Sequence, residues 1–372
     1  MAAQLSQEML KFGHEVCIVA LDHKTTAQNW FGVDVVPSMH NLPDSPADLY
    51  YWDEKFESDV ILQLFDVWCI GRQWIENNRS PVIVYSPIDC HGMPHYFKES
   101  SKNASLLLGM SKHALKEFKK ANLGKSQYLP HSIHTDLYQP LSKFQCRFKY
   151  KFPKKTLADD AFVIGLIGTN ISERKNIPGQ LLAFRMFLDR CPEANAYFYL
   201  QTVLTPFTSN GFDLKYVIEG LRLNDRVLIA PPAEVVNKIY DDSMMCEIYN
   251  CFDVLTQCSY GEGFGIPMVE AQSCGIPVIG SKCSAITEVI GDGGILVDRG
   301  VVKCVPDTNS WQFIADPMAV SEKYELLWRN SQLRGELSEK ARINAQKYDW
   351  KIWSPVWNRT FEKVSMRGKH CW

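Results

Sequence analysis

The feature that most constrains the fold is a strand, a glycine-rich loop and a helix in direct succession. Asp253–Gln257 reads D-V-L-T-Q, a short apolar run typical of a buried strand. Glycines follow on alternate positions from 261 to 265, and Pro267 stands where a helix can begin, because the first helical turn needs no amide donor. Gly275 and Pro277 end this helix before the next apolar run. Such a unit presents backbone amides and a helix dipole to an anion.

Two carboxylates occupy particular positions in this unit. Glu262 lies among the loop glycines, and Glu270 follows eight residues later, in the predicted first turn of the helix. A favourable interaction with the helix dipole explains Glu270 alone equally well. It does not explain Glu262. Together the two suggest a site where amides meet phosphates and carboxylates accept hydrogen bonds from sugar hydroxyls.

The sequence E-G-F-G-I-P-M-V-E-A, followed by G-I-P-V-I and S-A-I-T-E, resembles the donor-site signature of retaining GT-B glycosyltransferases of family 4. Glu262 and Glu270 match the Glu-x7-Glu motif of that family. The resemblance implies that Glu262 faces the transferred sugar and that Glu270 holds the ribose of the nucleotide. It also implies that the loop and the helix start lie near the diphosphate, through Gly263, Phe264, Gly265 and Ile266.

A second loop follows the apolar run Phe162–Ile167 and carries two adjacent cations, Arg174 and Lys175. Taken alone, the pair is most simply a solvated loop pair. The order G-x-N-x3-R-K-N, however, resembles the diphosphate-binding loop of the same family, so we expect the cations to neutralise a diphosphate leaving group. The resemblance adds Asn170 to this loop and places the nucleotide base near Pro231.

Polar residues also follow a strand in the N-terminal half. The run Pro81–Tyr85 leads into S-P-I-D-C-H-G, which resembles a P-x-D-G-x-P turn that borders the sugar and the acceptor in one branch of the family. Asp89 and His91 are therefore candidate catalytic residues, because ligands of open α/β sheets bind at the carboxyl ends of strands. An ordinary loop histidine is the alternative for His91.

The alternation of strands and helices predicts an α/β protein. The resemblance implies a GT-B fold, with two doubly wound Rossmann-like domains facing across a cleft. We expect residues 1–143 to form the acceptor-side domain, residues 144–347 the nucleotide-sugar domain, and residues 348–372 a helix that crosses back. The family begins with a strand and a glycine-rich turn, whereas this chain begins within the helix that follows them, so the first domain is expected to lack both. Two further expectations are a solvated basic linker over 141–160 and a helix over 311–330.

Composition narrows the classes of function. The 372 residues have a net charge of −2, which argues against non-specific nucleic-acid binding. The sequence shows neither a membrane span nor a signal-peptide pattern, so we expect a cytoplasmic protein, with peripheral membrane contact left open. The twelve cysteines contain no C-x2-C pair, which favours free thiols in a reducing compartment. Asp241-Asp242 more simply caps a helix than binds a metal, and we expect no metal and no cofactor besides the donor.

Together with these features, the resemblance implies a retaining, metal-independent hexosyltransferase. The donor would be a GDP-, UDP- or ADP-linked sugar, and the acceptor a glycan, a lipid or a protein-linked group. A sugar-nucleotide epimerase or a phosphorylase is a rival within the same fold. A non-catalytic GT-B relic, serving as a binding or interaction module, is a rival of another class.

Overall fold

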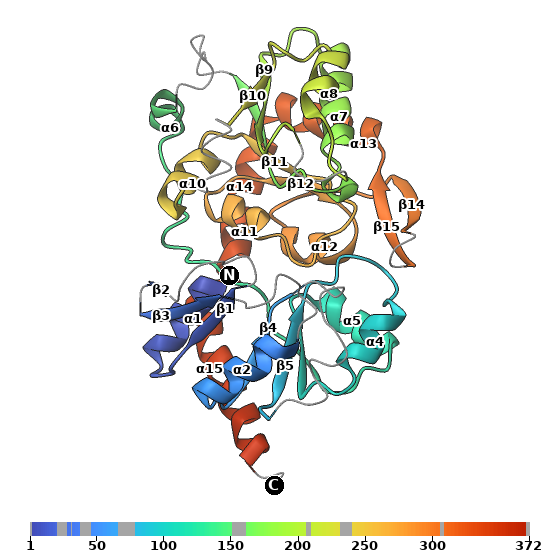
Figure 1. Cartoon of the computed structure of the whole chain (residues 1–372). Helices are drawn as coiled ribbons and strands as arrows, with labels where there is room; N and C mark the ends of the chain where they lie inside the picture. Colours follow the sequence, from blue (N-terminus) through green and yellow to red (C-terminus); the bar gives the residue numbers. More distant parts are fainter. Residues whose placement is uncertain are drawn as a thin grey trace. The chain divides into compact units, whose positions relative to one another are not determined.

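The structure is a computed structural model that describes residues 2–20, 28–30, 32–37, 46–65, 79–150, 161–205, 210–230, 240–305 and 309–369. The chain divides into two compact units (Figure 1). The first comprises residues 1–132, 305–310 and 350–372, and the second comprises residues 133–304 and 311–349.

The second unit is built on a six-stranded sheet in the order β10-β9-β8-β11-β12-β13, in which neighbouring strands pair in parallel. Its order reverses direction between β8 and β11, as the predicted doubly wound sheet requires. The strands are β8 (Phe162–Ile167), β9 (Ala196–Gln201), β10 (Val227–Ile229), β11 (Val254–Gln257), β12 (Val278–Ser281) and β13 (Gly294–Val297). The helices are α7 (Ile177–Arg190), α8 (Leu214–Gly220), α10 (Asp242–Tyr249), α11 (Ile266–Ser273), α12 (Ser284–Ile290), α13 (Pro317–Arg329) and α14 (Ser331–Gln346).

The first unit holds a four-stranded parallel sheet, β4-β5-β6-β7, and a three-stranded sheet, β1-β3-β2. The strands are β1 (Cys17–Ala20), β2 (Gln28–Trp30), β3 (Val33–Pro37), β4 (Ile61–Gln63), β5 (Val82–Ser86), β6 (Leu106–Gly109) and β7 (Ser126–Tyr128). The helices are α1 (Ala2–Lys11), α2 (Pro46–Phe56), α4 (His95–Ser101), α5 (Lys112–Lys120) and α15 (Trp350–Lys369). Apolar residues of β4, β5 and β6 form a buried core with apolar residues of α4 and α5.

The last helix returns to the first unit, as the sequence predicts. α15 packs against α1, and the buried ring of Trp357 meets Tyr85 of β5 with the ring centroids 5.0 Å apart. Trp353 meets Tyr128 of β7 in the same edge-to-face manner. Trp353 and Trp357 therefore pack against strands of the first unit.

The predicted helix over 311–330 is wrong in its first part. Residues Gly300–Val305 (β14) and Ser310–Ala315 (β15) pair as a two-stranded sheet, drawn in orange in Figure 1. The helix α13 begins only at Pro317, where the side chain of Asp316 accepts a hydrogen bond from the Met318 amide. An aspartate followed by proline is a helix start signal, and it separates the strand from the helix.

The predicted solvated linker over 141–160 is wrong for Arg147, whereas the Lys149 side chain is 60% exposed. Lys143–Lys149 forms helix α6, and residues 151–160 lie outside the described residues. Arg147 is only 6% exposed and donates to the carbonyls of Cys251 and Ala161 and, at 2.8 Å, to the Asp253 carboxylate. A guanidinium provides five donors in a fixed plane, so it can satisfy several buried acceptors at once. Arg147 thus anchors α6 to the residues that precede β8 and β11.

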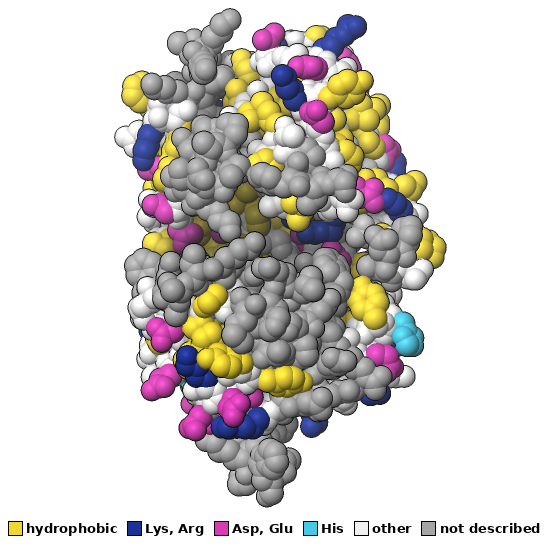
Figure 2. Space-filling model, viewed as in Figure 1, with side chains coloured by type: hydrophobic (Ala, Val, Ile, Leu, Met, Phe, Trp, Pro, Cys, Tyr) yellow, Lys and Arg dark blue, Asp and Glu magenta, His cyan; other side chains and the backbone are white. Residues whose placement is uncertain are grey.

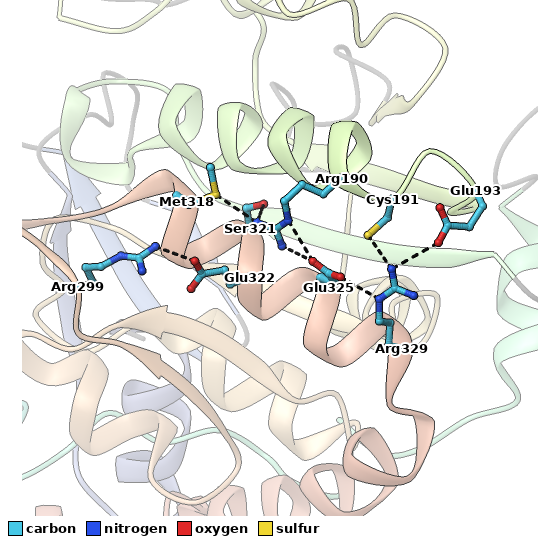
Figure 3. A network of polar contacts seen from close by, with 9 residues as sticks. All are labelled: Arg190, Cys191, Glu193, Arg299, Met318, Ser321, Glu322, Glu325 and Arg329. Carbon is cyan, nitrogen blue, oxygen red and sulfur yellow. Dashed lines mark hydrogen bonds and ion pairs between the residues drawn. The ribbon is translucent and has the colours of Figure 1, made fainter.

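Helices α7 and α13 lie side by side and are joined by a network of ion pairs (Figure 3). Glu325 accepts from Arg190 and, at 2.8 Å, from Arg329 one turn further along α13. On the molecular face in Figure 2, the described Lys and Arg side chains lie interspersed with Asp and Glu. Among the described helices, none combines the length and the apolar character that a membrane span needs.

Candidate functional site

The two loops singled out in the sequence meet in the second unit. Strands β8 and β11 are paired neighbours, so the loops at their carboxyl ends lie at the same edge of the sheet. Arg174 Nη1 lies 2.7 Å from Glu262 Oε2, and Lys175 Nζ lies 2.8 Å from Glu262 Oε1. Arg174 also donates to the Gly261 carbonyl at 2.8 Å. The structure therefore brings together one carboxylate and two cations from loops almost ninety residues apart in the sequence.

Backbone conformations hold these loops in place. Arg174 and Lys175 lie in a single 3-10 turn, Glu173–Lys175, that ends at Asn176 in the left-handed region (φ +50°). The side chain of Asn176 donates to the Cys258 carbonyl at 3.1 Å, and the Tyr260 amide donates to the Arg174 carbonyl at 2.8 Å. These bonds between the two loops fix where the cations stand relative to the glycine loop.

Gly265 begins α11 with φ +98°, a conformation that L-residues with a side chain rarely adopt. A Cβ atom at this position would also lie 2.1 Å from the Met268 side chain. Both observations explain why glycine stands here. Because Pro267 occupies the first turn, the start of α11 follows the predicted loop-to-helix geometry.

Glu262 is 4% exposed and is surrounded by donors. Besides the two cations, Gln257 Nε2 donates to Oε1 at 3.2 Å, and the Glu262 amide donates to Ser284 Oγ at 2.9 Å. Burial alone would raise the pKa of Glu262, but Arg174 and Lys175 outweigh burial and hold the pKa well below its usual range. The carboxylate is therefore ionised at any physiological pH.

Sequence reasoning did not assign a role to Gln257 or to Ser284. Ser284 has φ +43°, which is uncommon for a residue with a side chain, and its hydroxyl accepts from the Glu262 amide. The only sequence signal for Ser284 is its place at the start of S-A-I-T-E, within the resemblance described above. Gln257 ends a strand that reads as an ordinary apolar run, so nothing in its pattern marks it.

Glu270 lies in the second turn of α11 and not in the first turn, since the helix begins at Ile266. The helix-dipole explanation of Glu270 therefore loses its basis. Tyr249, at the end of α10, donates to Glu270 Oε2 at 2.6 Å. Burial raises the pKa of Glu270 to about 7, although the hydroxyls of Tyr249 and Tyr138 oppose the shift. Near neutral pH both the acid and the base form of this carboxyl group are therefore populated.

Three other predicted residues belong to the second unit. Gly263 and Phe264 belong to the glycine loop, and the Phe264 ring meets Tyr348 edge to face at 5.3 Å. Asn170 is buried, and its amide bonds with the backbone of Val203 and of Phe212, which supports the loop after β9. Its predicted donor contact stays a prediction.

Three further predicted residues belong to other parts of the sequence. Pro231 lies outside the described residues. Asp89 and His91 follow β5 in the first unit; Asp89 is half-buried and His91 is exposed. Asp241 caps α10 through a 2.7 Å bond from the Met244 amide, which confirms its predicted structural role.

Part of the chain is similar in sequence to known proteins. Residues 186–307 match the model of the family described as glycosyl transferases group 1. The O-antigen chain mannosyltransferase B of Escherichia coli is 34% identical over 79 residues, which are 19% of this chain and 21% of the relative. The D-inositol 3-phosphate glycosyltransferase of Arthrobacter sp. (strain FB24) is 28% identical over 144 residues, which are 38% of this chain and 29% of the relative. The chain thus spans less than a third of either relative's length in these matches.

Solved structures resemble the chain over almost its whole length. Sucrose-phosphate synthase from Thermosynechococcus elongatus superposes with a TM-score of 0.76 at 15% identity, over 97% of this chain and 92% of that one. WaaG, a glycosyltransferase involved in lipopolysaccharide biosynthesis, superposes with a TM-score of 0.70 at 15% identity, over 96% of this chain and 94% of WaaG. Anabaena HepE in complex with UDP-glucose superposes with a TM-score of 0.69 at 15% identity, over 98% of this chain and 95% of HepE.

The fold is therefore GT-B, as predicted from the sequence. The match over residues 186–307 confirms the predicted kinship with the group 1 glycosyltransferases.

Proposed function

We propose that the chain transfers a hexosyl group from a nucleotide-diphosphate sugar to a glycan, lipid or protein-linked acceptor, with retention of anomeric configuration. The observation that carries this proposal is the pairing of Glu262 with Arg174 and Lys175 at the carboxyl ends of β8 and β11. A relative of the same fold is described in complex with UDP-glucose, which supports a nucleotide-sugar donor.

The two cations would stabilise the leaving group. Lys175 is a point charge and Arg174 a planar fork, and both match phosphate oxygens. When a diphosphate binds, its oxygens would take up donors that now serve Glu262. As the bond to the sugar breaks, negative charge grows on the diphosphate, and fixed cations stabilise that charge without reorganisation. This chemistry would not need a metal ion at the donor.

The two carboxylates would divide the recognition of the donor. Glu262, which is ionised, would face the transferred sugar and accept from its hydroxyls, while Glu270 would accept from the ribose. We expect retention to come from attack on the same face as the departing diphosphate, without an enzyme nucleophile. The acceptor side, with Asp89 and His91, stays a prediction from the resemblance.

A non-catalytic relic is the second candidate, and the arrangement around Glu262 weighs against it. A module that had lost the reaction would have no need to keep a buried carboxylate that accepts from Arg174, Lys175 and Gln257, since burying a charge is costly unless it is fully paired. The free cysteines of the described residues, most of them buried, support our proposal of a reducing cytoplasmic compartment.

The test is turnover of UDP-, GDP- and ADP-sugars with simple glycosides as acceptors. Release of nucleoside diphosphate gives the rate, and the anomeric proton signal of the product gives the stereochemistry. We expect Lys175→Met to lower the rate by roughly 10²–10³-fold, because it removes one stabilising donor. Lys303→Met is the matched control, since Lys303 pairs with Glu173 on the outside of the same region. An inverted product would overturn retention, and equal rates for both variants would overturn the role of Lys175.

A further inference from the structure

Two histidines and a glutamate gather in the first unit. One potential ligand atom from each of His91, His113 and Glu117 lies within 4.8 Å of the other two. His113 and Glu117 are four residues apart on α5, so they share one face of that helix. His91 comes from the loop after β5, and its Nδ1 lies 3.8 Å from Glu117 Oε1. The two imidazole rings stand edge to face with their centroids 4.8 Å apart.

The hydrogen bonds around this cluster orient its members. His113 Nε2 lies 2.8 Å from the Cys90 carbonyl oxygen. A carbonyl oxygen only accepts, so Nε2 carries the proton and Nδ1 keeps its lone pair. In a metal-binding histidine, the ring nitrogen that does not bind the metal usually donates to such an oxygen. Glu117 Oε2 accepts from the Gly92 amide at 3.0 Å, which leaves Oε1 on the side of His91. Burial lowers the pKa of His113, so its ring is neutral near pH 7.

We propose that His91, His113 and Glu117 bind one divalent transition-metal ion of the Zn²⁺ class, with water completing the coordination. Two imidazoles and one carboxylate with an open position form a known ligand set for Zn²⁺. His91 is about half exposed, so an ion can reach the site from solvent. His91 would then serve as a metal ligand and not as the catalytic residue for which the sequence makes it a candidate.

Binding requires only small movements. Ligand atoms at about 2.0–2.1 Å from a tetrahedral ion stand roughly 3.4 Å apart, so the present separations must contract by up to about 1.4 Å. His91 is on an exposed loop and can make most of that movement. Lys120 Nζ, now 2.7 Å from Glu117 Oε1, would turn away, which its 54% exposed side chain allows. The ion would tie the loop after β5 to α5.

The test uses the full chain without an affinity tag, treated with a chelator and then titrated with Zn²⁺ by calorimetry. We expect one ion per chain. His91→Ala and Glu117→Gln should each weaken binding by about tenfold or more. His95→Ala is the matched control, because His95 is also an exposed histidine of this region but lies outside the cluster, and it should bind as the wild type does.

Cobalt gives a second measurement of the same site. Co²⁺ bound by two imidazoles and a carboxylate should give an absorption band in the visible range, which His91→Ala should abolish. Because His91 is exposed, this variant should fold normally, and its melting curve in chelator checks that. The absence of stoichiometric binding by the wild type would overturn the proposal. Equal affinities of the wild type, His91→Ala and Glu117→Gln would overturn it as well.

Discussion

Replacing Glu262 by glutamine should destabilise the second unit and should make it more sensitive to phosphate ligands. Glutamine keeps the shape of the side chain but removes the charge that Arg174 and Lys175 share. Removing one member of a fully buried ion pair costs about 3–5 kcal/mol. Here the side chains of Arg174 and Lys175 are 29% and 14% exposed. Solvent therefore stabilises the unpaired cations and reduces this cost. We therefore expect a loss of about 2 kcal/mol.

Calorimetric melting measures this loss. For a unit of about 150–250 residues, ~2 kcal/mol corresponds to a fall of roughly 4–8 °C in melting temperature. Inorganic pyrophosphate should then raise the melting temperature of Glu262→Gln more than that of the wild type. In the variant, Arg174 and Lys175 can bind the pyrophosphate without first breaking their ion pairs with Glu262. Glu173→Gln is the control, since Glu173 is 45% exposed and pairs on the surface. Equal melting of Glu262→Gln and the wild type, or equal stabilisation by pyrophosphate, would refute the reasoning.

Three further predictions concern stability. Arg147→Met should lower the free energy of unfolding by about 3–5 kcal/mol, because it removes a buried partner of the Asp253 carboxylate. Lys149→Met, on the exposed side of α6, should lower it by less than about 1 kcal/mol. Urea unfolding of the two variants measures both losses. Glu325→Gln should shift the melting temperature by less than about 3 °C, because its ion pairs are on the surface, and a larger shift would contradict this. Glu270→Gln should become more stable relative to the wild type as the pH rises from 4.5 to about 7, by at most ~3 kcal/mol. The reason is that the pKa of Glu270 is higher in the folded protein than in the unfolded chain, so ionisation of Glu270 opposes folding. Parallel stability-against-pH profiles of the two proteins would refute this.

The central part of the fold could be predicted because its signals are local. The run D-V-L-T-Q, the glycines that follow and Pro267 each restrict the backbone within a few residues, and the structure has β11, a loop and α11 at these positions. Asp241 likewise caps the helix that follows it, as predicted. Such signals need no knowledge of distant residues.

The errors arose where distant contacts decide the outcome. A basic segment around Arg147 resembles a solvated linker until Asp253 is brought beside it by the fold, more than a hundred residues later. Trp311–Ala315 contains apolar residues that suit either a helix or a strand, and its pairing with β14 decides between them. The support of Glu262 by Ser284 also depends on tertiary structure.

The most direct test of the account is a thermal-shift screen of the full chain with UDP-, GDP- and ADP-sugars, repeated with Glu270→Ala. A working donor site predicts that one nucleotide class raises the melting temperature of the wild type, with a much smaller rise for the variant. If the folded wild type shows no shift with any nucleotide sugar, or if the variant shifts equally, the proposed donor site is contradicted and the relic becomes the better account.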